Sequence, residues 1–126
     1  MGMGDVKGKV LPKVSLLSKS VNNNSIVSRY FTPYSCHETH AVTGTCCVAS
    51  SCLIPGTVGF RLLNKKDNSL NCNTETIKIE HPMGSIDCII VLNSNFKNNL
   101  VSKKDLIKSC GIYRTSRILM KGQVYF

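Results

Sequence analysis

One uncharged segment constrains the fold of this 126-residue chain more than any other feature. Residues 41–54 are all small, apolar, hydroxyl-bearing or thiol-bearing. A helix without a charged face is expected to be buried on every side, so the segment predicts a central buried helix. The hydroxyl of Thr43 or Thr45 is expected to cap its start by accepting a hydrogen bond from an unpaired amide of the first turn. Pro55 and Gly56 end it, since proline disfavours helical geometry in the preceding residue.

Segments on both sides of this helix have the composition or the alternation of β-strands. Segment 76–80 alternates polar and apolar residues with a period of two, and segment 85–92 is rich in β-branched residues. Pro82 and Gly84 lie between them and favour a turn, so we expect a hairpin. The other strand candidates are 13–17, 57–63 and the bent or paired segment 111–126.

The order of these elements predicts an α+β fold in which an antiparallel sheet curls around the central buried helix. Two further helices are expected over 25–31 and 103–109. A chain of this length forms about one domain with one core. Hydrophobic residues make up 42% of the chain and charged residues 18%, which is typical of a globular protein and excludes a disordered or fibrous one.

The formal net charge of +9 raises the question of a nucleic-acid partner, because Lys and Arg side chains supply most of the non-specific affinity for phosphates. The basic residues are scattered along the chain, however. The longest runs are the pairs 65–66 and 103–104, and no aromatic residues are interleaved with them. We therefore expect a basic surface exposed to solvent and no nucleic-acid site.

Neither a membrane protein nor a secreted protein is predicted. No stretch approaches the roughly 20 uninterrupted apolar residues of a membrane helix, and the first residues lack the apolar block of a secretory signal. We therefore expect a cytoplasmic protein without a membrane partner. The seven cysteines are odd in number and include the adjacent Cys46 and Cys47, so reduced, mostly buried thiols are expected in place of disulfides.

The cysteine-rich start of the helix allows two alternative interpretations, a zinc site or a reactive thiol. Cys36, His37, His40 and Cys46 are the right residue types for zinc, but they lack the paired short spacings of known zinc modules, so we expect no metal. A reactive thiol at Cys46 or Cys47 is the second alternative, because a helix N-terminus lowers the pKa of a cysteine. Burial opposes that shift, so inert core cysteines are expected.

Four ordered blocks of the sequence resemble the PrpF family. They are 37–44, 54–58, 81–84 and 113–125, and residues 2–4 extend the resemblance to the start of the chain. The family contains methylaconitate isomerases and related tautomerases of unsaturated tricarboxylates, such as 4-oxalomesaconate tautomerase. The resemblance implies the two-domain fold of diaminopimelate epimerase, in which each domain curls a sheet around a central helix. It also implies that residues 1–126 are a single domain corresponding to the second, C-terminal domain, with the first domain absent.

The start of the central helix is the expected substrate-binding site. A helix N-terminus carries unpaired amides and about half a positive charge, so it attracts a carboxylate. The resemblance implies that this helix opens into the cleft between the two domains and supplies one of two anion-binding ends. The substrate-binding candidates are His37, Thr43, Gly44, Thr45, His81, Gly84 and Arg114.

Several of these residues have a structural alternative. His37 is equally suited to a structural hydrogen bond near the helix start. Packing is the expected role of His40, and His81 with Gly84 is also compatible with a plain hairpin turn. Arg114, in preference to Arg117, can offer two parallel hydrogen bonds to a carboxylate, and its alternative is a cation on a strand surface.

The function implied by the resemblance is isomerisation of small unsaturated tri- or dicarboxylates, by removal of a proton beside an activated double bond and its return at another carbon. Such chemistry requires no organic cofactor. In the resembling proteins the proton-transferring lysine and cysteine lie in the first domain, so no catalytic residue is assigned here. The implied partner is the missing first domain or a chain carrying it, and the isolated chain is expected to be inactive. The alternative is a non-catalytic remnant or small-anion-binding module.

Overall fold

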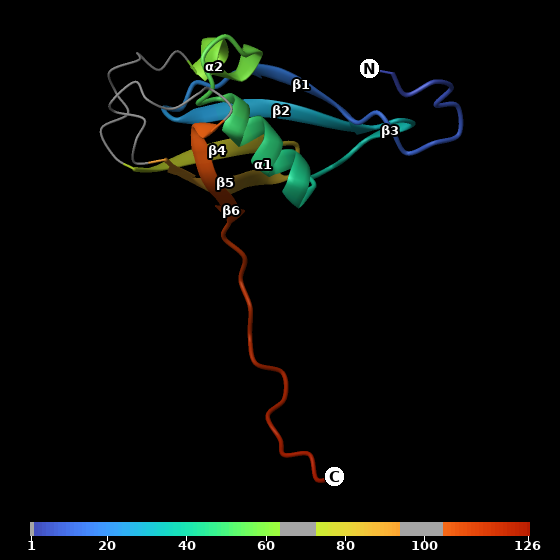
Figure 1. The fold of residues 1–126 in the computed structure, drawn as a ribbon, viewed down its shortest axis with the longest axis vertical. Coiled ribbons are helices and arrows are strands. Elements are labelled where there is room, and N and C mark those ends of the chain that lie inside the picture. The colour runs from blue at the N-terminus through green and yellow to red at the C-terminus, as the bar shows by residue number, and fades with distance from the viewer. Residues whose placement is uncertain (1, 64–72, 94–104) are drawn as a thin grey trace.

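The computed structural model describes residues 2–63, 73–93 and 105–126. A six-stranded mixed sheet carries two helices, so the α+β class is confirmed (Figure 1). The strands run in the order β1-β2-β4-β5-β6, and β3 pairs with β2 outside this path. The elements are β1 (Val14–Lys19), β2 (Ser25–Thr32), β3 (Ser35–Cys36), α1 (Val42–Ser51), α2 (Val58–Leu63), β4 (Thr74–His81), β5 (Gly84–Leu92) and β6 (Ile107–Ile112).

The sheet is mixed, which corrects the expectation of a purely antiparallel one. Strands β2 and β4 run parallel, with Ile26 beside Ile79, while the other neighbouring strands are antiparallel. The parallel pairing follows from the connection between them, because the segment with α1 and α2 lies between β2 and β4 in the chain and returns it to the end of the sheet at which β2 begins. The expected hairpin of β4 and β5 is confirmed, and β1 lies where a strand was expected.

The helix expected over 25–31 is wrong, because this segment forms β2. Ile26, Ser28 and Tyr30 are buried, while Arg29 between them is exposed. This period of two is that of a strand with one covered face. The segment also contains β-branched and aromatic residues, which fit a pleated surface better than a helix.

The strand expected over 57–63 is also wrong, because α2 occupies most of it. The Thr57 hydroxyl accepts a hydrogen bond from the Phe60 amide over 3.2 Å, as an N-cap side chain does. Gly56 before it has a φ of 94°, a left-handed conformation that glycine adopts without strain. The turn and the cap together start a new helix where the apolar content alone suggested a strand.

The last segments also differ from expectation. The helix predicted over 103–109 is replaced at Ile107 by β6, and residues 103–104, like the basic pair 65–66, lie outside the described residues. Of the strands expected over 111–126, only residues 111–112 belong to one. Residues 113–126 are extended, exposed and run away from the body of the protein (Figure 1).

The core lies between α1 and one face of the sheet. Helix α1 packs on β4, β5 and β6, while α2 packs on β1, β2 and α1. The fully buried apolar side chains of the core are Ile26, Ala49, Cys52, Leu53, Ile77, Ile79, Cys88 and Ile90. Val42 and Cys47 are exposed, so α1 is covered on one side only and not on every side as expected. No helix in the described part of the chain has the length and hydrophobicity needed to span a bilayer.

Candidate functional site

The start of α1 leaves backbone amides free to bind an anion. Ala41 is the N-cap, with extended φ and ψ of -67° and 143°, and the Thr45 amide donates to its carbonyl over 2.8 Å. The amides of Val42, Thr43 and Gly44 have no hydrogen-bond partner among the described residues. No acidic side chain lies in the first turn, so nothing there neutralises the positive end of the helix.

The cap expected from Thr43 or Thr45 is wrong. Both threonines lie inside the helix, and position 41, where a cap must stand, holds an alanine without a hydroxyl. The fully buried Thr45 donates its hydroxyl to the Ala41 carbonyl over 3.0 Å, so neither its hydroxyl nor its amide is available to a substrate. Thr43 is exposed and keeps its free amide. The amides left free at the helix start are therefore those of residues 42–44, one residue before the amides of 43–45 that were expected to bind an anion.

His40 lies buried beside the helix start and is hydrogen-bonded through both ring nitrogens. Its Nδ1 is 3.3 Å from the Ala41 carbonyl oxygen and 3.1 Å from Thr45 Oγ1, and its Nε2 is 3.0 Å from Ser28 Oγ. A carbonyl oxygen only accepts, which assigns the ring proton to Nδ1 and makes Ser28 the donor to Nε2. The ring also packs on Tyr30 at a centroid distance of 4.6 Å, in keeping with the packing role expected for His40.

His37 presents an N–H donor beside this group. Its amide donates to the Tyr30 carbonyl over 2.7 Å, which fixes the backbone after β3. Its Nδ1 accepts the Thr39 amide over 3.2 Å, so the proton of the neutral ring lies on Nε2. Nε2 has no partner among the described residues. The expected structural hydrogen bond and a free donor for a substrate therefore coexist in one side chain.

His81 ends β4 and turns the chain into β5. Its Nδ1 accepts the Met83 amide over 3.3 Å, which leaves its Nε2 as the donor of the neutral ring. Gly84, paired with His81, has a φ of 136°, so its role is to close the hairpin turn. Burial lowers the pKa of His40, and the ring charges of His81 and His37 lower it further. His37 and His40 both lie beside the Tyr30 ring, at centroid distances of 6.2 Å and 4.6 Å. We call residues 42–44 with these three histidines the helix entrance.

The stability of the chain should fall as the pH drops below about 6.5, the ordinary pKa of histidine. Burial holds the pKa of His40 below that value, and nearby His81 and His37 lower it further. The unfolded chain therefore takes up this proton first, so neutral His40 stabilises the fold above about pH 6.5, and the contribution is lost as the pH falls towards the lowered pKa. Urea unfolding at several pH values should show this slope, and His40→Phe should flatten it. An unchanged slope in the variant would contradict the role given to His40.

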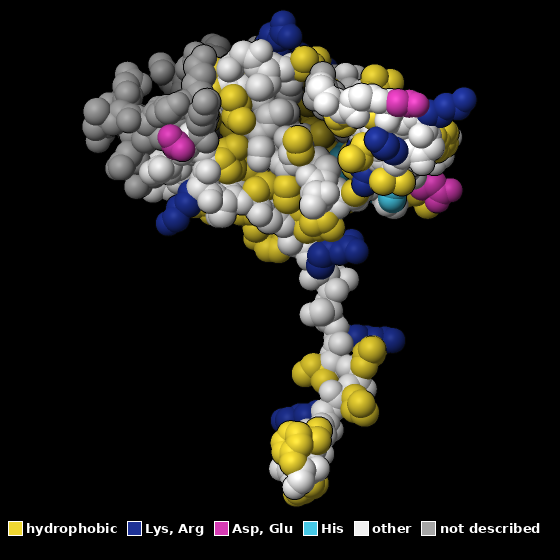
Figure 2. All heavy atoms as spheres, turned by 45° about the vertical axis from the view of Figure 1, so that its right-hand side comes forward, with side chains coloured by type: hydrophobic (Ala, Val, Ile, Leu, Met, Phe, Trp, Pro, Cys, Tyr) yellow, Lys and Arg dark blue, Asp and Glu magenta, His cyan; other side chains and the backbone are white. Residues whose placement is uncertain are grey.

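Arg114 does not join the helix entrance in this structure. It lies in the exposed segment 113–126 and makes no hydrogen bond or ion pair with another described residue. Figure 2 shows hydrophobic and basic side chains along this segment and no acidic one. Its apolar side chains are strongly exposed, with Leu119 at 81% and Tyr125 at 87%.

Ser28 and Tyr30 belong to the site, although the sequence analysis did not single them out. Both are buried on β2 and hold His40 in place, Ser28 by its hydroxyl and Tyr30 by its ring. Their spacing of two from Ile26 is the signal in the sequence that indicates a strand with one buried face. Tyr30 also explains Gly44, because a Cβ added there would lie 2.6 Å from Tyr30 Cε2.

The zinc set considered for the cysteine-rich stretch does not form. Cys46 Sγ lies near the thiols of Cys88 and Cys110, and the exposed Cys36 points its thiol at the His37 carbonyl, 3.8 Å away. Burial raises the pKa of Cys46, which opposes a reactive thiolate. All six described cysteines are free thiols, and only Cys52 and Cys88 are buried, which corrects the expectation of mostly buried thiols.

Comparison with known proteins identifies the relatives of this chain. The family model described as PrpF protein matches residues 9–126. YbhH of Escherichia coli is 34% identical over 125 residues, which cover 99% of this chain and 32% of YbhH. The 4-oxalomesaconate tautomerase of Pseudomonas putida is 33% identical over 124 residues, which cover 98% of this chain and 30% of that protein.

A solved structure agrees with the fold. The crystal structure of a methylitaconate-delta-isomerase superposes with a TM-score of 0.55 at 24% identity, over 86% of this chain and 29% of that one. The chain spans about a third of the length of the curated relatives it matches.

Proposed function

The chain belongs to the PrpF protein family, and from this premise we propose that it forms the carboxylate-binding part of an isomerase of small unsaturated polycarboxylates. The helix entrance carries the proposal. Three backbone amides at the start of α1 have no partner among the described residues, and His37 and His81 each add an N–H donor at Nε2. The name of the Pseudomonas putida relative, an oxalomesaconate tautomerase, supports the substrate class. Methylaconitate-type double-bond migration is the reaction proposed.

On this chain, the proposed reaction requires hydrogen-bond donors rather than a base. A proton leaves the carbon beside a carboxylate-conjugated double bond, and the electron pair shifts into a dienolate. The double bond then reforms one position along as a proton returns to the far carbon. Negative charge gathers on the conjugated carboxylate, and fixed N–H donors stabilise it without reorganising. His40 is neutral and fully hydrogen-bonded, so it positions the helix start and takes no part in the proton transfer.

The acid and base of the reaction are proposed to come from a first domain, as in a two-domain protein with the fold of diaminopimelate epimerase. Two observations support such a partner. The chain covers about a third of its relatives, so most of their length has no counterpart here. The segment 113–126 exposes a run of apolar side chains that nothing in the described chain covers, which is typical of an interaction surface.

Replacing Val42 by proline tests the helix entrance. Val42 is the first helical residue and is half exposed, and proline is tolerated there because that amide has no intrahelical partner. Ala41 before it already has the extended conformation that a following proline requires. The variant thus deletes one donor amide and leaves the helix intact. Loss of one hydrogen bond to a charged ligand should weaken trans-aconitate binding about tenfold or more.

The matched control is Val42→Ala, which removes the same side chain and keeps the amide. Binding is followed by the NMR resonances of residues 42–44 at raised salt, with sulfate and citrate beside trans-aconitate, because a surface of +9 attracts any polyanion. If both variants weaken trans-aconitate binding equally, or if the NMR shifts are confined to surface lysines, the helix entrance is not an anion-binding site. The alternative of an inactive remnant is then favoured. The 126 residues alone should bind and yet show no isomerisation.

A further inference from the structure

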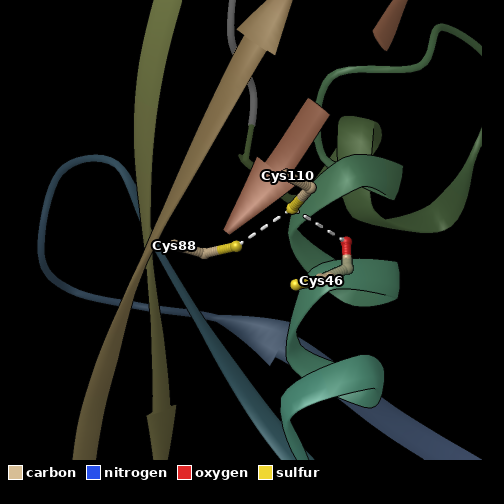
Figure 3. Close-up of side chains that lie close together, drawn as sticks. All are labelled: Cys46, Cys88 and Cys110. Atoms are coloured by element: carbon tan, nitrogen blue, oxygen red, sulfur yellow. Dashed lines mark hydrogen bonds between the residues drawn. The ribbon is translucent and has the colours of Figure 1, made fainter. Parts of the chain in front are cut away.

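Three thiols from separate elements meet at the edge of the core. Cys46 comes from α1, Cys88 from β5 and Cys110 from β6, and their sulfur atoms all lie within 4.8 Å of one another (Figure 3). Cys88 is fully buried, while Cys46 and Cys110 are partly exposed. The helix entrance uses none of them. Their convergence therefore calls for a separate explanation.

The geometry of these thiols does not suit a disulfide. Cys110 stands directly opposite Ile90, and Cys88 opposite Ile112, so the two cysteines are diagonal neighbours on the same face of an antiparallel pair. Diagonal neighbours are about 7 to 8 Å apart, at or beyond the limit of about 7 Å between the Cα atoms of a disulfide. The thiols of Cys88 and Cys110 instead form a sulfur–sulfur hydrogen bond of 3.2 Å.

We propose that Cys46, Cys88 and Cys110 form a three-coordinate site for a monovalent copper ion, Cu(I). A metal at about 2.3 Å from each of three sulfurs in a plane sets them about 4.0 Å apart. The observed separations, from 3.2 Å to no more than 4.8 Å, lie on either side of this value. Small side-chain rotations suffice to close the site, because the three residues are already held by a helix and two paired strands.

The type and the number of the ligands determine which ion fits the site. Soft thiolates favour Cu(I), zinc and iron–sulfur clusters over hard cations. A structural zinc site requires four ligands, and in the described part of the chain no fourth histidine, cysteine or carboxylate joins this group. Cu(I) is satisfied by three thiolates, so the missing fourth ligand favours copper.

Binding is a proton exchange without any change of oxidation state. Each thiol releases its proton to solvent as its sulfur bonds to the ion, and copper enters and stays as Cu(I). Burial raises the pKa of Cys46 and of Cys88, so the thiols stay protonated until an ion with high thiolate affinity displaces the protons. The partly exposed Cys46 and Cys110 give the ion access, and both pack against the buried core to which Cys88 belongs.

The test is an anaerobic titration of the 126-residue chain with Cu(I) against a colorimetric Cu(I) chelator. One equivalent should bind far more tightly than the rest, and copper X-ray absorption should show three sulfur neighbours. Cys110→Ser and Cys46→Ser, which change only partly exposed side chains, should each weaken that equivalent by more than the 10- to 100-fold that loss of an outer hydrogen bond to a ligand costs. Cys47→Ser, the exposed neighbour on α1, is the matched control and should leave it unchanged.

The alternatives overturn the proposal in separate ways. Equal loss in Cys47→Ser, or no loss in the two cluster variants, would place copper at surface thiols. A tight equivalent of zinc in a parallel titration, with four neighbours in its absorption spectrum, would make the site divalent. Circular dichroism of each variant confirms that the fold is retained. Neither copper result depends on trans-aconitate binding, so this proposal and the helix entrance fail independently.

Discussion

Replacing Leu53 by alanine should lower the free energy of unfolding by about 2 to 5 kcal/mol. Leu53 is fully buried, follows the last turn of α1 and belongs to the core between that helix and the sheet. Its amide donates to the Ser50 carbonyl over 3.1 Å, so the backbone is fixed and cannot collapse into the space that the leucine leaves. The cost is lost apolar transfer energy plus the cavity. Urea unfolding followed by circular dichroism measures it.

The matched control for this substitution is Leu16→Ala. Leu16 lies on β1 and is 60% exposed, so its truncation should change the free energy of unfolding by no more than about 0.5 kcal/mol. A similar loss in both variants would mean that Leu53 does not lie in the core of the folded chain. The contrast thus tests the arrangement of α1 over β4, β5 and β6 on which both proposed sites depend.

The sequence predicted the elements whose pattern has a single interpretation. An uncharged segment closed by Pro55 and Gly56 indicated α1, and strict alternation around Ile77 and Ile79 indicated β4. The Pro82 and Gly84 turn then fixed the hairpin with β5. These signals are local, because the end of a helix or an alternation with a period of two depends on only a few neighbouring residues.

The sequence did not predict elements whose residues suit a helix and a strand about equally. Apart from Arg61, Val58–Leu63 carries no polar side chain, so its pattern shows no clear period, and the cap at Thr57 is what distinguishes α2 from a strand. In β2 the alternation includes Ser28, which is polar and yet buried because His40 satisfies its hydroxyl. A polar residue on the buried face weakened the strand signal. At such positions, the residues that pack against the segment in the folded chain decide whether it forms a helix or a strand.

In the candidate site, too, some residues could be predicted from the local sequence, while others come together only in the folded chain. His37 and His81 were predicted from their local blocks, and the Nε2 of each has no partner among the described residues. The thiol cluster was not foreseeable, since Cys46, Cys88 and Cys110 come together only through the register of β5 on β6 and the crossing of α1. Arg114 lies on the exposed segment 113–126 and does not reach the helix entrance, so its role in carboxylate binding stays a prediction.

Replacing Gly44 by valine should destabilise the chain by about 2 to 3 kcal/mol. An added Cβ would lie 2.6 Å from Tyr30 Cε2 and 3.2 Å from His40 Cε1. Both rings are 5% exposed, so neither can swing aside into solvent. Removing a glycine from a helix would by itself gain up to about 1 kcal/mol, less for a β-branched residue, and the overlap exceeds that gain.

Gly111→Val is the control for this overlap. Gly111 lies on β6, nothing stands within 4 Å of an added Cβ, and valine suits a strand, so its stability should change by no more than about 0.5 kcal/mol. Equal stability of Gly44→Val and the parent chain in urea would show that Tyr30 does not pack on the first turn of α1. The expected loss also explains why Gly44→Val cannot test anion binding. It displaces Tyr30 and His40 together with the amide, whereas Val42→Pro removes an amide alone.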